Sequence, residues 1–242
     1  MSCKQIRKMA TSNEKHDNEL LQRIANHLII NSSFLDNLGL FHGKMGIVIF
    51  FYHYSRYTNN PLYEEFAGEL LDEIFEEIHD RLLIDFENGY LGIGWGIEYL
   101  AEQKFISGDT NDILEEIDKK VMERDVRRIT DVSLNTGLEG ILHYVLTRLQ
   151  NNNHPIHLFD KEYLNDLSKT INNINKKMIS ESLLSLINHY HQCITSKQSN
   201  YKPLDYFTSF YSEVALENNK LHEWKLGLVN GCAGVGLKCI NI

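Results

Sequence analysis

Four glycine-punctuated turns, each followed by an apolar segment, constrain the fold of this chain more than any other feature. They lie at residues 39–46, 89–96, 137–140 and 227–236. The first two intervals between them are close to the ~40–50 residues of a two-helix repeat, and the third interval is about twice as long. We therefore predict a chain built from one repeated unit, with one glycine turn lost from the third interval.

The segments between the turns show two kinds of helix pattern. Residues 47–57 are apolar nearly all round, which predicts an inner helix enclosed by others, whereas 63–79 are apolar on one face and acidic on the other, which predicts an outer helix. The same alternation predicts an inner helix around 97–100 and an outer helix at 113–128, and it starts again at Gly137. Further helices are predicted at 13–30, 158–174 and 180–194. No stretch keeps the two-residue alternation of a strand, so the predicted fold class is all-α.

Length, charge and cysteine content exclude several classes of protein. The chain has 242 residues, enough for one domain spanning 1–242, in which we expect residues 1–12 to be disordered. Its net charge of -9, with scattered acidic residues, argues against nucleic acid and membrane partners and leaves a cationic peptide or a neutral small molecule. The first residues lack the apolar core of a secretory signal, and the four cysteines are predicted to be free thiols, so we expect a cytoplasmic protein.

A Gly-x-x-Gly turn at a helix start lets neighbouring chain segments approach closely and exposes unpaired N–H groups at the positive end of the helix. If all inner helices run the same way, their turns gather at one end of the bundle. We expect a functional site at that end, although glycines that only pack inner helices against outer ones would recur in the same way.

Three motifs in this order carry a resemblance to a known family. They are Gly39-Leu-Phe-His-Gly-Lys-Met-Gly-Ile47, Gly92-Ile-Gly-Trp-Gly-Ile-Glu-Tyr-Leu100 and Gly231-Cys-Ala-Gly-Val-Gly236. The chain resembles the lanthionine synthetase C-like proteins, which implies an α/α toroid of inner and outer helices. A full toroid of that family has seven inner helices, and fewer can be placed here. We therefore expect an incomplete ring whose open edge is covered by residues 29–35, by a homodimer partner or by another protein.

The resemblance also implies a chemistry from which this chain departs. Cyclases of the family add a peptide cysteine thiol across a dehydrated serine or threonine, with a zinc ion held by two cysteines and one histidine. This chain has neither Cys-His-Gly nor Trp-Cys-x-Gly, and Glu139 and Asn230 stand where ligand-bearing turns would place theirs. Cys232 and Cys239 would lie about 10 Å apart along a helix, too far to share a metal ion. We predict buried cysteines, no metal and no cofactor.

His42 matches the position of the histidine beside the active site of the family's cyclases. The resemblance therefore makes His42 a candidate catalytic acid or base, since imidazole suits proton transfer near neutrality. The alternative is a helix-start histidine bonded to a neighbouring turn. Trp95, Glu139, His143 and Asn230 are candidate substrate-binding residues on the same rim, and each has a purely structural alternative.

Three functions remain open on the sequence alone. The preferred one is a non-catalytic or altered family member that binds a peptide or a peptide-modification enzyme at the glycine-turn end. The second is an enzyme, either a thioether cyclase with an atypical metal site or a hydrolase using carboxylates such as Glu98 and Glu139 about 5–9 Å apart. The third is a scaffold without a site, for which a filled toroid centre would be the signature.

Overall fold

The computed structural model describes residues 3–150, 158–174, 179–196, 199–211, 220 and 223–242, and in these residues the chain is all-helical. The α-helices are α1 (Cys3–Asn31), α2 (Lys44–Thr58), α3 (Leu62–Glu77), α4 (Tyr90–Glu102), α5 (Thr110–Met122), α6 (Leu138–Gln150), α7 (Lys161–Asn173), α8 (Glu181–Ser196), α9 (Pro203–Phe210) and α10 (Cys232–Cys239). Two short 3₁₀ helices are η1 (Ser32–Phe34) and η2 (Val126–Arg128). None of the described helices is both long and apolar enough to cross a membrane.

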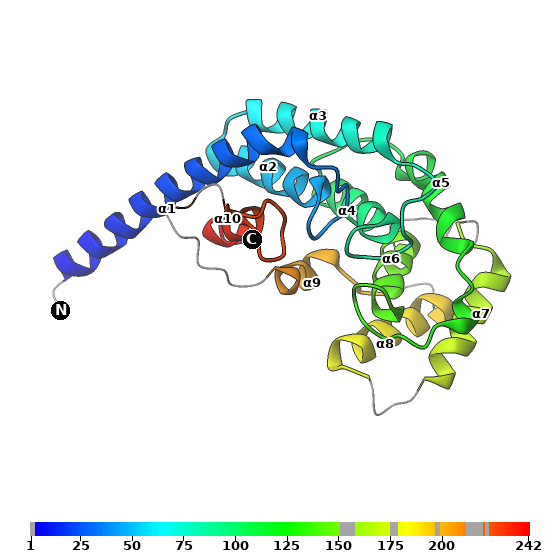
Figure 1. Ribbon diagram of the computed structural model, residues 1–242. Coiled ribbons are helices and arrows are strands. Elements are labelled where there is room, and N and C mark those ends of the chain that lie inside the picture. Colours follow the sequence, from blue (N-terminus) through cyan, green and yellow to red (C-terminus); the bar gives the residue numbers. More distant parts are fainter. Residues whose placement is uncertain (1–2, 151–157, 175–178, 197–198, 212–219, 221–222) are drawn as a thin grey trace.

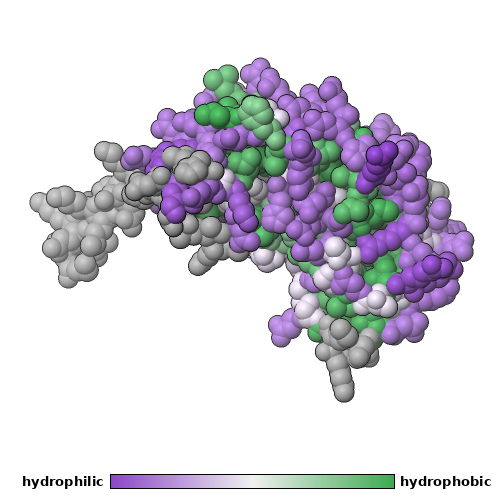
Figure 2. Space-filling view, viewed as in Figure 1, coloured by the Kyte–Doolittle hydropathy of each residue, from purple (hydrophilic) through white to green (hydrophobic). Residues whose placement is uncertain are grey.

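The helices form two layers. The inner layer runs in the order α10, α2, α4, α6 and α8, with each helix packed on the next, and Figure 1 shows these helices as an arc. In the outer layer α1 packs on α10, α3 on α2 and α5 on α4, while α7 lies against η2. Hydrophilic side chains cover most of the face seen in Figure 2, as expected where outer helices meet solvent. This arrangement is the α/α toroid expected from the sequence, and the helix predicted at 180–194 is the inner helix α8.

Burial separates inner from outer helices as the sequence patterns predicted. Every residue of α2 from Lys44 to Ser55 is buried, whereas α3 buries only a stripe. That stripe consists of Ala67, Leu70, Leu71 and Ile74. An all-apolar helix is stable in water only when other helices surround it, so α2 requires α3 on one side and α10 and α4 on its flanks.

Two helix starts differ from the sequence-based boundaries. Helix α4 already begins at Tyr90, so most of the glycine-rich stretch 89–96 is helical. Its glycines make room for neighbours, because a Cβ atom on Gly94 would lie 2.4 Å from the Tyr144 ring. Helix α1 begins at Cys3, inside the stretch 1–12 that was expected to be disordered; this stretch contains neither glycine nor proline, so a helix can continue through it.

A buried ionic cluster joins three helices. Arg148 on α6 donates to Glu98 of α4 at 2.5 Å and to Asp118 of α5 at 2.6 Å, and none of the three side chains is more than 5% exposed. The Tyr144 hydroxyl donates to the same Asp118 carboxylate at 2.6 Å. Glu98 therefore lies in a closed cluster with its charge compensated by Arg148.

The sequence did not predict α9, which lies inside the arc on its open side (Figure 1). The Phe207 ring of α9 lies 4.7 Å from the Tyr99 ring, and the Phe210 ring lies 5.1 Å from that of Trp95, measured between centroids. Aromatic side chains of α9 thus fill the centre of the described ring. In segment 29–35 Ile30 and Phe34 are exposed, and cover of the open edge by this segment stays a prediction.

Candidate functional site

The four glycine turns share one backbone design. In each, the N–H of the first helical residue donates to the carbonyl seven positions earlier in the chain. These bonds are Lys44 to Asn37 at 2.8 Å, Tyr90 to Leu83 at 2.9 Å, Leu138 to Asp131 at 3.0 Å and Cys232 to Lys225 at 2.8 Å. One orphan N–H at each helix start is therefore satisfied within its own turn. The four helix starts thus share one backbone hydrogen-bond pattern.

Backbone hydrogen bonds also join the turns side by side. They run from Val229 to Phe41 at 3.0 Å, from Phe41 to Glu87 at 2.9 Å and from Phe86 to Asn135 at 2.7 Å. Gly39 shows how closely the turns pack, because a Cβ atom there would lie 2.2 Å from the Cα atom of Asn88. The turns before α10, α2, α4 and α6 thus form one continuous rim, which we call the glycine rim.

His42 is paired across the glycine rim with a residue that the sequence did not single out. Its Nε2 atom lies 2.8 Å from Oε1 of Glu87, and the side chains are 36% and 25% exposed. A carboxylate at this distance fixes the orientation of the imidazole ring, as an acid or base would require. The same contact also fits a purely structural bond between turns, so the catalytic role of His42 stays a prediction.

Trp95 and His143 lie beneath the rim and are joined by Tyr201. The indole N–H of Trp95 donates to the Tyr201 hydroxyl oxygen at 3.0 Å, and that oxygen lies 2.8 Å from Nδ1 of His143. Since the hydroxyl oxygen accepts from Trp95, its own proton is available to Nδ1. Burial lowers the pKa of His143 to about 3, so the ring is neutral near pH 7. Their predicted contact with substrate is not tested by this geometry.

Glu139 and Asn230 lie at different points of the rim. Oε1 of Glu139 accepts a hydrogen bond from the Ser182 hydroxyl of α8 at 2.5 Å. Asn230 is exposed and precedes Gly231, as His42 precedes Gly43, and its φ of 54° lies in the left-handed region that asparagine tolerates. Asn230 and His42 are on neighbouring turns, whereas Glu139 is separated from them by α4. Substrate binding by Glu139 and Asn230 stays a prediction.

The described residues do not fit the zinc ion of the family's cyclases. Burial raises the pKa of the Cys232 thiol to about 12, and its sulfur lies 3.9 Å from the Leu226 carbonyl oxygen. Cys232 is therefore a buried thiol that keeps its proton in the metal-free chain. In the part of the chain that the structure describes, no three His, Cys, Asp or Glu side chains are grouped so as to hold a metal ion.

The family comparison agrees with this architecture. The sequence model of the family described as lanthionine synthetase C-like protein matches residues 35–191, from the end of η1 into α8 and therefore more than half of the chain. No curated protein and no solved structure matches the chain. With the repeated turns and the two-layered helices, the match shows that the chain belongs to the lanthionine synthetase C-like family.

Proposed function

We propose that this protein is a non-catalytic or altered member of its family that binds a peptide, or a peptide-modification enzyme, at the glycine rim. The observation that carries the proposal is the contrast between the rim and what lies beneath it. Backbone hydrogen bonds join the four turns as one continuous rim, while aromatic side chains of α9 fill the ring centre. A ligand is therefore expected to lie on the rim rather than inside the ring.

The rim has the chemistry to hold an extended peptide. Four inner helices start there, and the positive ends of their dipoles favour a ligand with carbonyl oxygens, although their first N–H groups are already bonded within the turns. The half-exposed pair of His42 and Glu87 adds a side-chain donor and acceptor between two of the turns, and exposed Asn230 adds an amide on the next turn. Peptide backbones carry one donor and one acceptor per residue, which matches such a mixed surface.

Side chains of the described residues occupy the ring centre around Trp95 and His143. Trp95 and His143 are at most 1% exposed, and their polar atoms are already joined through Tyr201. A peptide that contacted them would have to displace α9. Together with the poor fit to zinc, this supports binding without the family's thioether chemistry.

A peptide with one cysteine and one dehydroalanine tests the proposal. We expect saturable binding of its fluorescein-labelled form in fluorescence anisotropy, weakened at least about fivefold by His42→Ala and by Glu87→Gln. Glu115→Gln, on the outer helix α5, is the control and should bind as the wild type does. Mass spectrometry should show no more thioether than in buffer, with or without added zinc. Zinc-dependent thioether formation, or no saturable binding, would contradict the proposal.

An enzymatic role is the second candidate, and the His42–Glu87 pair is the observation that favours it. A thioether cyclase with an atypical metal site, or a hydrolase, would use this pair for proton transfer. The hydrolase version with Glu98 and Glu139 has less support, because Glu98 is enclosed with Arg148 and Glu139 faces Ser182. Turnover that is lost in Glu87→Gln while peptide binding is retained would establish the enzymatic role.

A further inference from the structure

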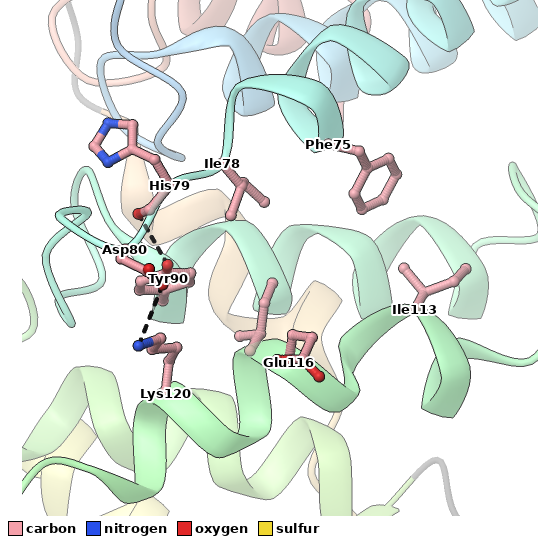
Figure 3. Close-up of a pocket in the computed structure, with 9 residues that line it drawn as sticks. Phe75, Ile78, His79, Asp80, Tyr90, Ile113, Glu116 and Lys120 are labelled. Atoms are coloured by element: carbon pink, nitrogen blue, oxygen red, sulfur yellow. Dashed lines mark hydrogen bonds and ion pairs between the residues drawn. The ribbon is translucent and has the colours of Figure 1, made fainter.

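A cleft of about 330 Å³ opens on the outer side of the molecule between α3 and α5. Phe75 and Ile78 of the α3 side face Ile113 and Ile117 of α5, and Tyr90 closes one end (Figure 3). Its volume is near the lower limit of the ~300–1,000 Å³ typical of ligand sites, enough for one or two bulky apolar side chains. Phe75 and Ile113 are 37% and 39% exposed, so each presents apolar surface to an incoming group.

Most polar groups of the cleft lie at one end, whereas Glu116 lies midway along its α5 wall (Figure 3). Lys120 lies 3.4 Å from Asp80, and the Tyr90 hydroxyl donates to the His79 carbonyl at 3.0 Å. Asp80 is 89% exposed, so its weak contact with Lys120 leaves the carboxylate accessible. The cleft therefore combines apolar walls with a polar, carboxylate-bearing end.

The surroundings of the cleft are strongly acidic. Residues 72–81 and 112–124, which contribute to its two walls, contain nine carboxylates besides the buried Asp118 and only four lysines and arginines. Glu116 lines the cleft and is 81% exposed. These segments hold most of the chain's net charge of -9. A cationic partner is drawn to such a surface and an anionic one is repelled.

We propose that this cleft docks a cationic segment of a protein partner, which inserts an aliphatic or aromatic anchor between α3 and α5 and places Lys or Arg beside Glu116 and Asp80. An apolar anchor in a pocket surrounded by complementary charge is a recurring way of binding peptide segments. The site goes beyond the rim binding proposed above and does not depend on it. Tyr90 nevertheless directly follows the turn that carries Glu87, so both surfaces lie at the same end of α4.

Two synthetic peptides test the cleft. One is a fluorescein-labelled amphipathic helix with leucines at helical spacing and lysines beside them, and the other has glutamate in place of each lysine. We expect the lysine peptide to bind the full chain saturably, more tightly at low ionic strength, and the glutamate peptide not to bind. Equal binding of both peptides, or no binding of the lysine peptide, overturns the proposal.

Substitutions in the cleft test whether the lysine peptide binds there. Phe75→Ala is expected to weaken affinity for the lysine peptide about tenfold, and Glu116→Lys about fivefold with a smaller salt dependence. Glu115→Lys is the matched control: it makes the same charge change at the next position of α5, outside the cleft lining, and should stay within about twofold of wild type. Equal losses in the Glu115 and Glu116 variants would show unspecific attraction and overturn the proposal. If circular dichroism shows that Phe75→Ala does not fold, the comparison of Glu116→Lys with Glu115→Lys tests the proposal.

A substitution on the glycine rim distinguishes binding in the cleft from binding on the rim. His42→Ala should leave affinity for the lysine peptide unchanged, because His42 lies on the rim and outside the cleft. Loss of lysine-peptide binding in this variant would place the peptide on the rim and overturn docking in the cleft. Failure of the dehydroalanine peptide to bind would count only against the rim proposal.

Discussion

Arg148 joins the inner helices α4 and α6 to the outer helix α5. All three of its guanidinium nitrogens donate, to one carboxylate on α4 and another on α5. A buried ion pair gains little over apolar packing, because removing its charges from water is costly, but a buried carboxylate without its partner is strongly destabilising. The cluster therefore favours the particular arrangement in which α4, α5 and α6 meet.

We expect Arg148→Met to lower the free energy of unfolding by about 3–5 kcal/mol, because it leaves Glu98 and Asp118 buried without a cation. In a chain of this size that corresponds to a fall in Tm of roughly 10 °C. Urea and thermal unfolding followed by circular dichroism measure both. Arg127→Met removes a surface arginine that pairs with Asp125 and should change stability by less than about 1 kcal/mol. Similar stability of the two variants would contradict the role given to the cluster.

The element that this fold repeats is the glycine turn with the inner helix that follows. Each turn brings the start of its helix back against a carbonyl seven residues earlier, and glycine at the turn is what permits the approach. At Gly89 a Cβ atom would lie 1.9 Å from the Leu83 carbonyl oxygen, which is the acceptor of the closing bond to Tyr90. The glycine is therefore required by the turn itself, whether or not the rim binds a ligand.

Gly89→Ala is accordingly expected to destabilise the protein by about 1–3 kcal/mol, since backbone atoms must shift to admit the methyl group. Gly68→Ala is the matched control. Gly68 lies inside α3 with no atom within 4 Å of a Cβ at that position, so alanine should stabilise the helix by up to about 1 kcal/mol. Urea unfolding should show a lower free energy of unfolding for Gly89→Ala and a higher one for Gly68→Ala. An unchanged free energy of unfolding in Gly89→Ala would argue against the geometry of the turn.

At the scale of the whole molecule, the arc of inner helices is completed by α9. The Phe210 ring lies within 6 Å of the rings of Phe41, Phe86, Trp95 and His143, which come from α4, α6 and two of the glycine turns. Aromatic groups of this kind bury large apolar areas and favour edge-to-face contacts. The centre of the protein therefore depends on a helix supplied by a distant part of the chain.

Phe210→Ala should cost about 3–5 kcal/mol of stability, because it opens a cavity where four aromatic rings meet. Leu204→Ala, on the same helix but 39% exposed, should cost less than about 1 kcal/mol. Chemical denaturation of the two variants gives the comparison. If both variants lost less than about 1 kcal/mol of stability, α9 would not pack in the ring centre.

The order of the helices from 13 to 194 and their inner or outer place could be predicted from the sequence, but several helix boundaries, α9 and the partners of the candidate residues could not. Asp109 caps α5, because its carboxylate accepts a hydrogen bond from the backbone N–H of Asn111. The pairing of His42 with Glu87 joins two repeat units, so it depends on how adjacent turns pack. Tyr201 was missed although Tyr206, Phe207, Phe210 and Tyr211 follow Pro203 at helical spacing, which was the one available signal for α9.

The sequence by itself determined the repeated unit, the alternation of inner and outer helices and the need for glycine at the turns, because these follow from periodicity and backbone sterics within short segments. Only the tertiary structure decided what fills the ring, which charges pair inside it and where Glu87 meets His42. Those contacts join residues far apart in the chain, and their energies depend on burial and distance, which local patterns do not encode. The same holds for the cleft between α3 and α5, which exists only because two outer helices lie side by side.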